Sequence, residues 1–132
     1  MTHQVCKALV LHCIDFRFRR KIAEFLDSKF GDSYDLVSVA GGVKQLVTDP
    51  AENNFIMEQL EISNRLHHPE SIILIQHEDC GAYGGSQAFK DFSMEQEHQN
   101  SELKKAEELL SKKFFQPKEK YFVRLSGEII AS

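Results

Sequence analysis

The chain of 132 residues has the length of one domain, and its 42% hydrophobic content with ten Phe is enough to form a core. A formal net charge of −4 gives no electrostatic reason to expect binding to nucleic acid or to an anionic membrane. No segment approaches the ~20 apolar residues that span a bilayer, and the first residues do not form a signal peptide. We therefore expect a single cytoplasmic domain over residues 1–132, with its three cysteines reduced.

Strand and helix patterns alternate along the chain. The predicted strands are 5–13, 35–39, 71–76 and, as a final strand or hairpin, 121–125 with 128–131. The predicted helices are 18–30, a helix that opens near residue 49 and ends before 69, and 94–114. This alternation favours an α/β fold with a mainly parallel sheet of four strands, in the order 2-1-3-4, covered by helices.

The middle helix has a recognisable start signal. Asp49 is predicted to be its N-cap, Pro50 its first helical residue and Glu52 its third, which together would form a capping box. Pro69 is expected to end the helix, because proline cannot continue the backbone hydrogen bonds.

Two short motifs stand where predicted strands end. Cys13 closes the first strand, and His77 and Cys80 follow the third. Ligands of open parallel sheets bind beyond the carboxyl ends of the strands, and the first and third strands are neighbours in the predicted order. Two thiolates and one imidazole form a soft ligand set that prefers zinc and leaves one tetrahedral position open. The sequence therefore predicts a catalytic zinc site.

A plainer interpretation treats the same residues as structural. Cysteine is among the most buried residue types, and a histidine at a strand end is usually a hydrogen-bonded surface group. Cys6 lies inside the first strand without a partner motif, so we interpret it as a core or edge thiol. The combination of Cys13 with His77 and Cys80 favours the metal site over this interpretation.

Asp15 and Arg17 follow Cys13 closely and form a possible ion pair. Arg17 can hold the Asp15 carboxylate by two hydrogen bonds and keep it away from the metal. If the pair opened, Asp15 could occupy the fourth metal position. Alternatively, Asp15 caps the helix that follows while Arg17 faces water, and this role is compatible with the first.

The motifs as a set resemble those of the β-class carbonic anhydrases. The matching stretches, in order and spacing, are Cys13-x-Asp15-x-Arg17, Ala40-Gly41-Gly42 and His77-x-x-Cys80-Gly81. The resemblance extends over nearly the whole chain. It implies Zn²⁺ held by Cys13, His77 and Cys80, with Asp15 and Arg17 as the catalytic pair beside it.

The resemblance also implies an activity and an assembly. The reaction is the reversible hydration of carbon dioxide to bicarbonate by zinc-bound hydroxide, and the protein is a homodimer or a larger even oligomer. Because carbon dioxide carries no charge, we expect a small, largely apolar substrate pocket. The residues expected to line it are Phe16, Val39, Gly41, Gly42 and Tyr83.

Three other functions are compatible with parts of the sequence. Ser38-Val39 stand where the family commonly has Arg-Asn, which makes a non-catalytic zinc-binding protein one alternative. Hydrolysis of carbon disulfide or carbonyl sulfide is another, because both molecules are linear and apolar. His12-Cys13-x₅-Arg19 also fits the letters of the cysteine-dependent phosphatases. Its loop is bulky, contains no glycine and carries a carboxylate where a phosphate would sit, which argues against that class.

Overall fold

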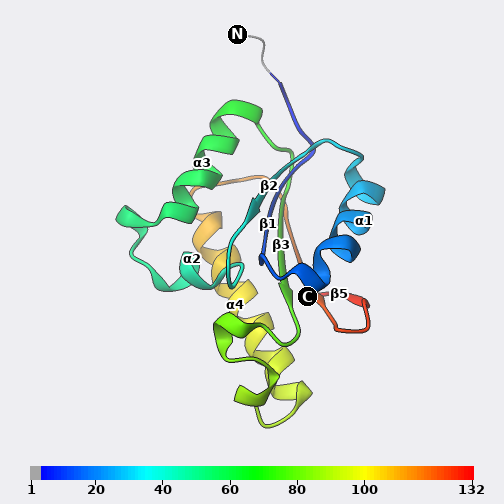
Figure 1. The fold of residues 1–132 in the computed structure, drawn as a ribbon. Coiled ribbons are helices and arrows are strands. Elements are labelled where there is room, and N and C mark those ends of the chain that lie inside the picture. The colour runs from blue at the N-terminus through cyan, green and yellow to red at the C-terminus, as the bar shows by residue number, and fades with distance from the viewer. Residues whose placement is uncertain (1–3) are drawn as a thin grey trace.

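Five strands form one sheet in the computed structural model, which describes residues 4–132, and their order is β2-β1-β3-β4-β5. Three pairings are parallel, β1 with β2, β1 with β3 and β3 with β4, whereas β5 is antiparallel to β4 (Figure 1). The strands are β1 (Ala8–His12), β2 (Tyr34–Ser38), β3 (Ile72–His77), β4 (Lys118–Val123) and β5 (Ile129–Ala131).

The predicted α/β class and the order 2-1-3-4 are confirmed, and the number of strands differs by one. The four-strand prediction did not count β5, although a C-terminal hairpin was one of the two forms expected there. A turn at Gly127, which has a φ of +93°, brings the chain back so that Ile129 pairs with Val123. The sheet is therefore mainly parallel with one antiparallel edge strand.

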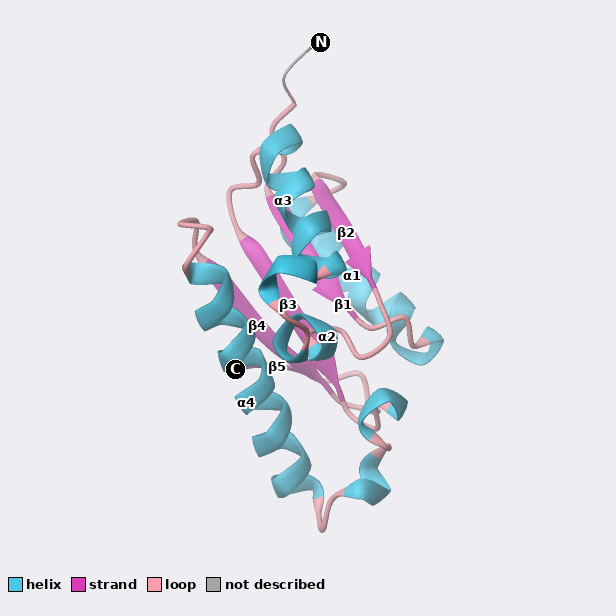
Figure 2. Cartoon of the chain, turned by 90° about the vertical axis from the view of Figure 1, so that its left-hand side faces the viewer, coloured by secondary structure: helices cyan, strands magenta, loops and turns pink. Residues whose placement is uncertain are grey.

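Helices cover both faces of the sheet, as Figure 2 shows. The helices are α1 (Arg19–Phe30), α2 (Lys44–Thr48), α3 (Phe55–His67) and α4 (Phe92–Ser111). Side chains of α2, α3 and α4 pack on one face against Leu9, Leu11 and Leu74, and α1 packs on the other face against Val10 and Ile73. Alternate residues of β1 thus enter two different cores, which explains why this strand is apolar throughout. No helix within residues 4–132 is long and apolar enough to cross a membrane.

The predicted capping box at the middle helix is wrong. Asp49 ends α2 instead, in an extended conformation, and Pro50 is also extended with ψ of 140°. The N-cap of α3 is Asn54, whose side chain accepts a hydrogen bond from the backbone N of Met57 at 3.0 Å. Asp49 and Asn54 are both good N-caps, and the buried packing of Asn54 at the end of α2 selects the later start.

The carboxyl ends of β1 and β3 meet at one edge of the sheet. Leu11 of β1 is paired with Leu74 of β3, so the residues that follow each strand emerge side by side. Cys13 comes directly after β1, and His77 is the last residue of β3. Parallel pairing of these two strands is therefore what brings the two predicted ligand motifs together.

Candidate metal centre

Cys13, His77 and Cys80 form one cluster, here called the metal centre. Their ligand atoms all lie within 4.8 Å of one another, and within the described part of the chain they are the one group of three or more potential ligands that meets this geometry. All three residues are buried. The sequence analysis named these residues, and the structure brings all of them together.

The imidazole of His77 is oriented for metal binding. Its Nδ1 atom lies 2.7 Å from the carbonyl oxygen of Glu78, which can only accept, so Nδ1 carries the proton. The Nε2 atom then has a free lone pair, is buried, and has no hydrogen-bond partner. Buried polar atoms are normally satisfied, and a metal ion bound at Nε2 would satisfy this one.

The two thiols of the metal centre have opposite pKa shifts. A hydrogen bond with Cys80 holds the pKa of Cys13 far below its ordinary value, and the same interaction, together with burial, raises the pKa of Cys80. The metal-free pair therefore shares one proton, with Cys13 as the thiolate. Metal binding needs both sulfurs as thiolates and would displace the remaining proton.

Asp15 and Arg17 form the ion pair expected from the sequence. The Arg17 Nη2 atom lies 2.7 Å from Asp15 Oδ2, and Nε lies 3.1 Å from Oδ1. Asp15 also accepts a hydrogen bond from the backbone N of Arg17 at 3.0 Å and so caps the 3-10 turn that follows. The ion pair and the capping bond considered for Asp15 are therefore both present. The guanidinium holds the pKa of the Asp15 carboxyl below its usual value.

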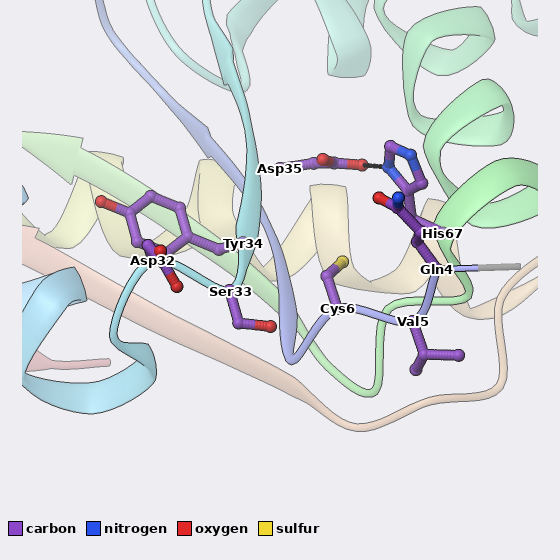
Figure 3. Close-up of a pocket in the computed structure, with 8 residues that line it drawn as sticks. All are labelled: Gln4, Val5, Cys6, Asp32, Ser33, Tyr34, Asp35 and His67. Atoms are coloured by element: carbon purple, nitrogen blue, oxygen red, sulfur yellow. Dashed lines mark hydrogen bonds and ion pairs between the residues drawn. The ribbon is translucent and has the colours of Figure 1, made fainter. Parts of the chain in front are cut away.

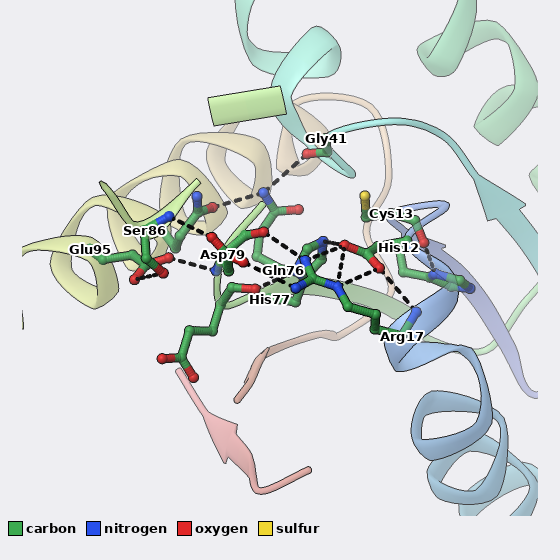
Figure 4. Close-up of polar contacts among 12 residues, drawn as sticks. His12, Cys13, Arg17, Gly41, Gln76, His77, Asp79, Ser86 and Glu95 are labelled. Atoms are coloured by element: carbon green, nitrogen blue, oxygen red, sulfur yellow. Dashed lines mark hydrogen bonds and ion pairs between the residues drawn. The ribbon is translucent and has the colours of Figure 1, made fainter. Parts of the chain in front are cut away.

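The carboxylate lies beside the metal centre. Asp15 Oδ2 is 3.9 Å from His77 Nε2, the unpartnered ring nitrogen. Figure 4 shows the side chain of Arg17 extending toward His77 and Asp79. A short rotation of the Asp15 side chain would move its oxygen toward the ligand position, while the bonds from Arg17 oppose that rotation.

A cavity of about 540 Å³ opens beside Cys13 and this ion pair. Its lining residues are Cys13, Ile14, Asp15, Phe16, Arg17, Ala40, Gly41, Gly81 and Ala82. The walls formed by Ile14, Phe16, Ala40 and Ala82 are apolar. Phe16 is 82% exposed, so in this chain it stands at the mouth of the cavity rather than in its depth.

Three of the residues predicted to line the substrate pocket are not in the lining of this cavity. Val39 packs against the core on the α2–α4 side, and Gly42 lies against the side chain of Gln76. The hydroxyl of Tyr83 donates to Glu102 at 2.9 Å and receives a bond from Gln76 Nε2 at 3.4 Å. Tyr83 is thus drawn into a buried polar network, whereas Phe16 and Gly41 line the cavity.

Sequence reasoning missed three residues that hold the loop after β3. Asp79 contacts Arg17 through its side chain and its carbonyl oxygen, and Glu95 of α4 bonds both Asp79 and Ser86. Asp79 directly precedes Cys80 in the sequence, but nothing in the sequence shows which group the Asp79 side chain contacts. Glu95 lies on the inward side of α4, where a polar residue interrupts the apolar stripe.

A second cavity, of about 280 Å³, lies at the opposite ends of β1 and β2 (Figure 3). It contains Cys6, the third cysteine, and an interaction of 2.6 Å between His67 Nδ1 and Asp35 Oδ2. Burial raises the pKa of the Cys6 thiol, which donates to the carbonyl oxygen of Ala8. Cys6 is therefore a protonated thiol outside the metal centre and serves as a matched control for the other two cysteines.

The overall fold has known counterparts among solved structures. β-Carbonic anhydrase isoform I of Trichomonas vaginalis aligns with a TM-score of 0.63 and 12% identity over 99% of this chain and 85% of that chain. A carbonic anhydrase of Streptococcus mutans aligns with a TM-score of 0.55 and 18% identity over 99% and 86%. The protein therefore has the β-carbonic anhydrase fold.

The sequence gives the family directly. The profile of a family described as "Putative carbonic anhydrase" matches residues 3–129, and the chain belongs to that family. An uncharacterized protein of Rickettsia conorii is 27% identical over 125 residues, which are 90% of this chain and 66% of the relative. One of Rickettsia bellii is 28% identical over 125 residues, or 90% and 75%. The chain thus spans about two thirds of the length of the first of these relatives.

Proposed function

We propose that this protein is a carbonic anhydrase that reversibly hydrates carbon dioxide to bicarbonate, with Zn²⁺ held by Cys13, His77 and Cys80, and that residues 1–132 act as one catalytic domain. The observation that carries the proposal is the buried, unpartnered Nε2 atom of His77 beside two thiols. Two sulfurs and one nitrogen suit zinc and leave a fourth position open. When bound, the zinc ion would lower the pKa of a water so that it supplies hydroxide near neutral pH.

In this proposal Asp15 and Arg17 orient the attack. Arg17 keeps the Asp15 carboxylate ionised, so Asp15 acts as a hydrogen-bond acceptor at neutral pH. Asp15 Oδ2, 3.9 Å from His77 Nε2, would accept a hydrogen bond from the attacking oxygen. That bond would turn a lone pair of the oxygen toward the cavity and the carbon atom of the substrate.

The cavity agrees with a small neutral substrate. Its walls at Ile14, Phe16, Ala40 and Ala82 offer apolar surface and no cation that would fix a large anion. Arg17 also lines the cavity, but its guanidinium is already bonded to two acidic residues. Carbon dioxide needs such a surface, because it has neither charge nor a strong hydrogen-bonding group.

We further propose that the protein is a homodimer or a larger even assembly. Ile14 and Phe16, at the cavity mouth, are 62% and 82% exposed in the single chain, and a second copy would cover them. Sedimentation should give at least a dimer at micromolar concentration, and a monomer would contradict this. The free thiolates that the metal centre requires agree with the cytoplasm as the compartment.

A stopped-flow hydration assay on protein with measured zinc content tests the activity. Asp15→Asn should lower kcat/KM at least about tenfold, because the amide holds the attacking oxygen in the wrong orientation. Asp49→Asn is the matched control, since Asp49 is an exposed carboxylate at the end of α2. One zinc per chain with no hydration rate above buffer would overturn the proposal.

The apolar cavity also favours a second candidate, the hydrolysis of carbon disulfide or carbonyl sulfide. Both are linear, uncharged and open to attack by hydroxide at carbon. Release of hydrogen sulfide by zinc-loaded protein that does not hydrate carbon dioxide would select this reaction. Absence of both activities at full zinc content would identify a non-catalytic zinc-binding protein. This is the alternative suggested by Ser38-Val39, which stand where the family commonly has Arg-Asn.

A further inference from the structure

Arg17 bonds two acidic residues at once, one on each edge of its planar guanidinium. Its Nε and Nη2 atoms bond the Asp15 carboxylate. Its Nη1 atom donates to Asp79 Oδ2 at 3.0 Å, and Nη2 also donates to the Asp79 carbonyl oxygen at 2.9 Å. Figure 4 shows these bonds converging on Arg17 from two sides. With both edges bonded, the guanidinium cannot rotate without breaking an ionic hydrogen bond.

Asp79 is itself held in place by the loop and by α4. Its backbone N donates to Glu95 Oε2 at 2.7 Å, and its Oδ1 atom accepts from the backbone N of Ser86 at 2.8 Å. The Ser86 hydroxyl donates to the other oxygen of Glu95 at 2.8 Å. Glu95 is buried, so this arrangement anchors Asp79 to the interior of the protein.

The backbone of Asp79 is in an uncommon conformation. Its φ is +61°, in the left-handed region that Asp and Asn tolerate better than most residues. The same loop holds Gly85, where a Cβ would lie 2.9 Å from Asp79 Oδ1. A turn alone would be formed as well by Gly or Asn, so the turn does not explain why a carboxylate faces Arg17.

We propose that Asp79 is a positioning residue that immobilises Arg17 and thereby keeps Asp15 on the guanidinium and away from the metal. The inference rests on the proposed function, since it requires a metal at Cys13, His77 and Cys80. The Arg17 side chain is 37% exposed, so its bonds to Asp15 alone would be weakened by competing water. The Asp79 side chain is also 35% exposed, but its backbone N and its Oδ1 are bonded to Glu95 and Ser86, so it gives Arg17 a second, fixed partner. Arg17 in turn fixes Asp15.

Two substitutions separate the carboxylate of Asp79 from its backbone role. Glycine adopts a positive φ without strain, so Asp79→Gly removes the side chain and keeps the turn. Asparagine also tolerates this φ, and its amide oxygen can still accept from Arg17 Nη1, so Asp79→Asn is the conservative variant. Thermal melts of both variants check that each folds.

The test uses Co²⁺ in place of zinc, because Co²⁺ binds the same nitrogen and sulfur ligands and its visible spectrum reports what occupies the fourth position. Azide is titrated as the ligand that competes with Asp15 for this position. In Asp79→Gly the Kd of azide should rise at least about tenfold, the effect of losing one hydrogen bond to a charged group. In Asp79→Asn it should rise less than about threefold.

A double variant isolates the role of Asp15. Asp15→Asn/Asp79→Gly should bind azide within about twofold of Asp15→Asn alone, because no carboxylate remains to close the site. An unchanged azide Kd in Asp79→Gly would overturn the inference. Equal weakening of azide binding with and without the Asp15 carboxylate would also overturn it, since Asp79 would then act through another group.

The metal-free protein provides a second measurement. In nuclear magnetic resonance, exchange of the Arg17 Nε–H proton with water should be slow in the wild type and in Asp79→Asn, and at least about tenfold faster in Asp79→Gly. Equal exchange rates would overturn the inference. If the variants bind azide as expected but the zinc-loaded wild type hydrates no carbon dioxide, the inference is supported and the proposed activity is overturned. A wild type that binds no metal would overturn both.

Discussion

The side-chain oxygen of Gln76 occupies the space into which a side chain on Gly42 would extend. A Cβ added at Gly42 would lie 2.1 Å from Gln76 Oε1. That oxygen accepts a hydrogen bond from the backbone N of Val43 at 2.9 Å, and Gln76 Nε2 donates to the carbonyl oxygen of Gly41 at 3.1 Å. Gln76, near the end of β3, thus holds the loop that supplies Ala40 and Gly41 to the cavity.

Gly42→Ala should therefore destabilise the protein more than an alanine at another positive φ. Both Gly42 and Gly127 have positive φ, but a Cβ at Gly127 would meet only the flexible side chain of Lys21. We expect about 1 kcal/mol for Gly127→Ala from the left-handed backbone, and roughly 2 kcal/mol more for Gly42→Ala because Gln76 must give up buried hydrogen bonds. Urea denaturation measures both, and equal losses would show that Gln76 moves away freely.

Zinc should stabilise the protein only when the metal centre is intact. At a free zinc concentration of about 1,000 times Kd, binding adds roughly 4 kcal/mol to the free energy of unfolding. The Tm of the wild type and of Cys6→Ser should rise on zinc addition and fall with a chelator. Cys80→Ser should show little change and hold less than one zinc per chain. Loss of zinc from Cys6→Ser would contradict the ligand assignment.

Alkaline pH should weaken the contact between β2 and α1. Tyr34 donates its phenolic proton to Asp27 Oδ1 at 2.6 Å, which raises the pKa of Tyr34 to about 12. The folded protein thus holds this proton more tightly than the unfolded chain, whose tyrosines titrate near pH ~10. The added stability is complete below that pH and is lost as the pH rises toward the folded pKa.

Tyr34→Phe isolates this contribution from the other groups that titrate at high pH. We expect the Tm of the wild type to fall more steeply than that of Tyr34→Phe above pH ~10, so that the two curves converge. Thermal melts between roughly pH 8 and pH 11 provide the comparison. Parallel curves would mean that Tyr34 keeps its ordinary pKa.

Removing the cap of α3 should be more harmful than removing the cap of α4. Asn54 caps α3, is buried, and donates to the carbonyl oxygens of Gln45 and Leu46 at the end of α2. Asp91 caps α4 by one exposed bond to Met94. Asp91→Ala should cost about 1 kcal/mol and Asn54→Ala at least about 2 kcal/mol, because the second substitution also removes the buried hydrogen bond to the Leu46 carbonyl oxygen. Chemical denaturation distinguishes these values, and equal losses would contradict the second role of Asn54.

The strand order and the metal centre were predictable because their signals are local. The first four residues of β1 and of β3 are apolar, and Cys13 and His77 stand at the ends of these strands, so the parallel pairing of β1 with β3 was enough to bring them together. The first residue of α3 could not be predicted from local signals in the same way, since Asp49 and Asn54 both have side chains that cap helices. Only the buried contact of Asn54 with α2 decides between them.

The support around the ion pair was not predictable. Arg17 and Asp79 are 62 positions apart, and which edge of the guanidinium Asp79 meets depends on the turn at φ +61°. Tyr83 carries no local signal that it turns toward Glu102 instead of the cavity. The partners in a buried polar network of this kind are decided by three-dimensional packing. The sequence only shows where a polar residue interrupts an apolar pattern.

The position of β1 in the sheet constrains the order in which the protein forms during synthesis. β1 leaves the ribosome before β2 and β3, and it lies between them in the sheet. Pairing with β2 is possible once the chain has been made up to Ser38, whereas His77 reaches Cys13 only after another 39 residues. Throughout that interval Cys13 lacks both His77 and Cys80, so the nascent chain cannot hold a metal ion with the three ligands of the metal centre. The metal centre can therefore be completed only after β3 and Cys80 have been made, and any metal-dependent step of folding comes after that point.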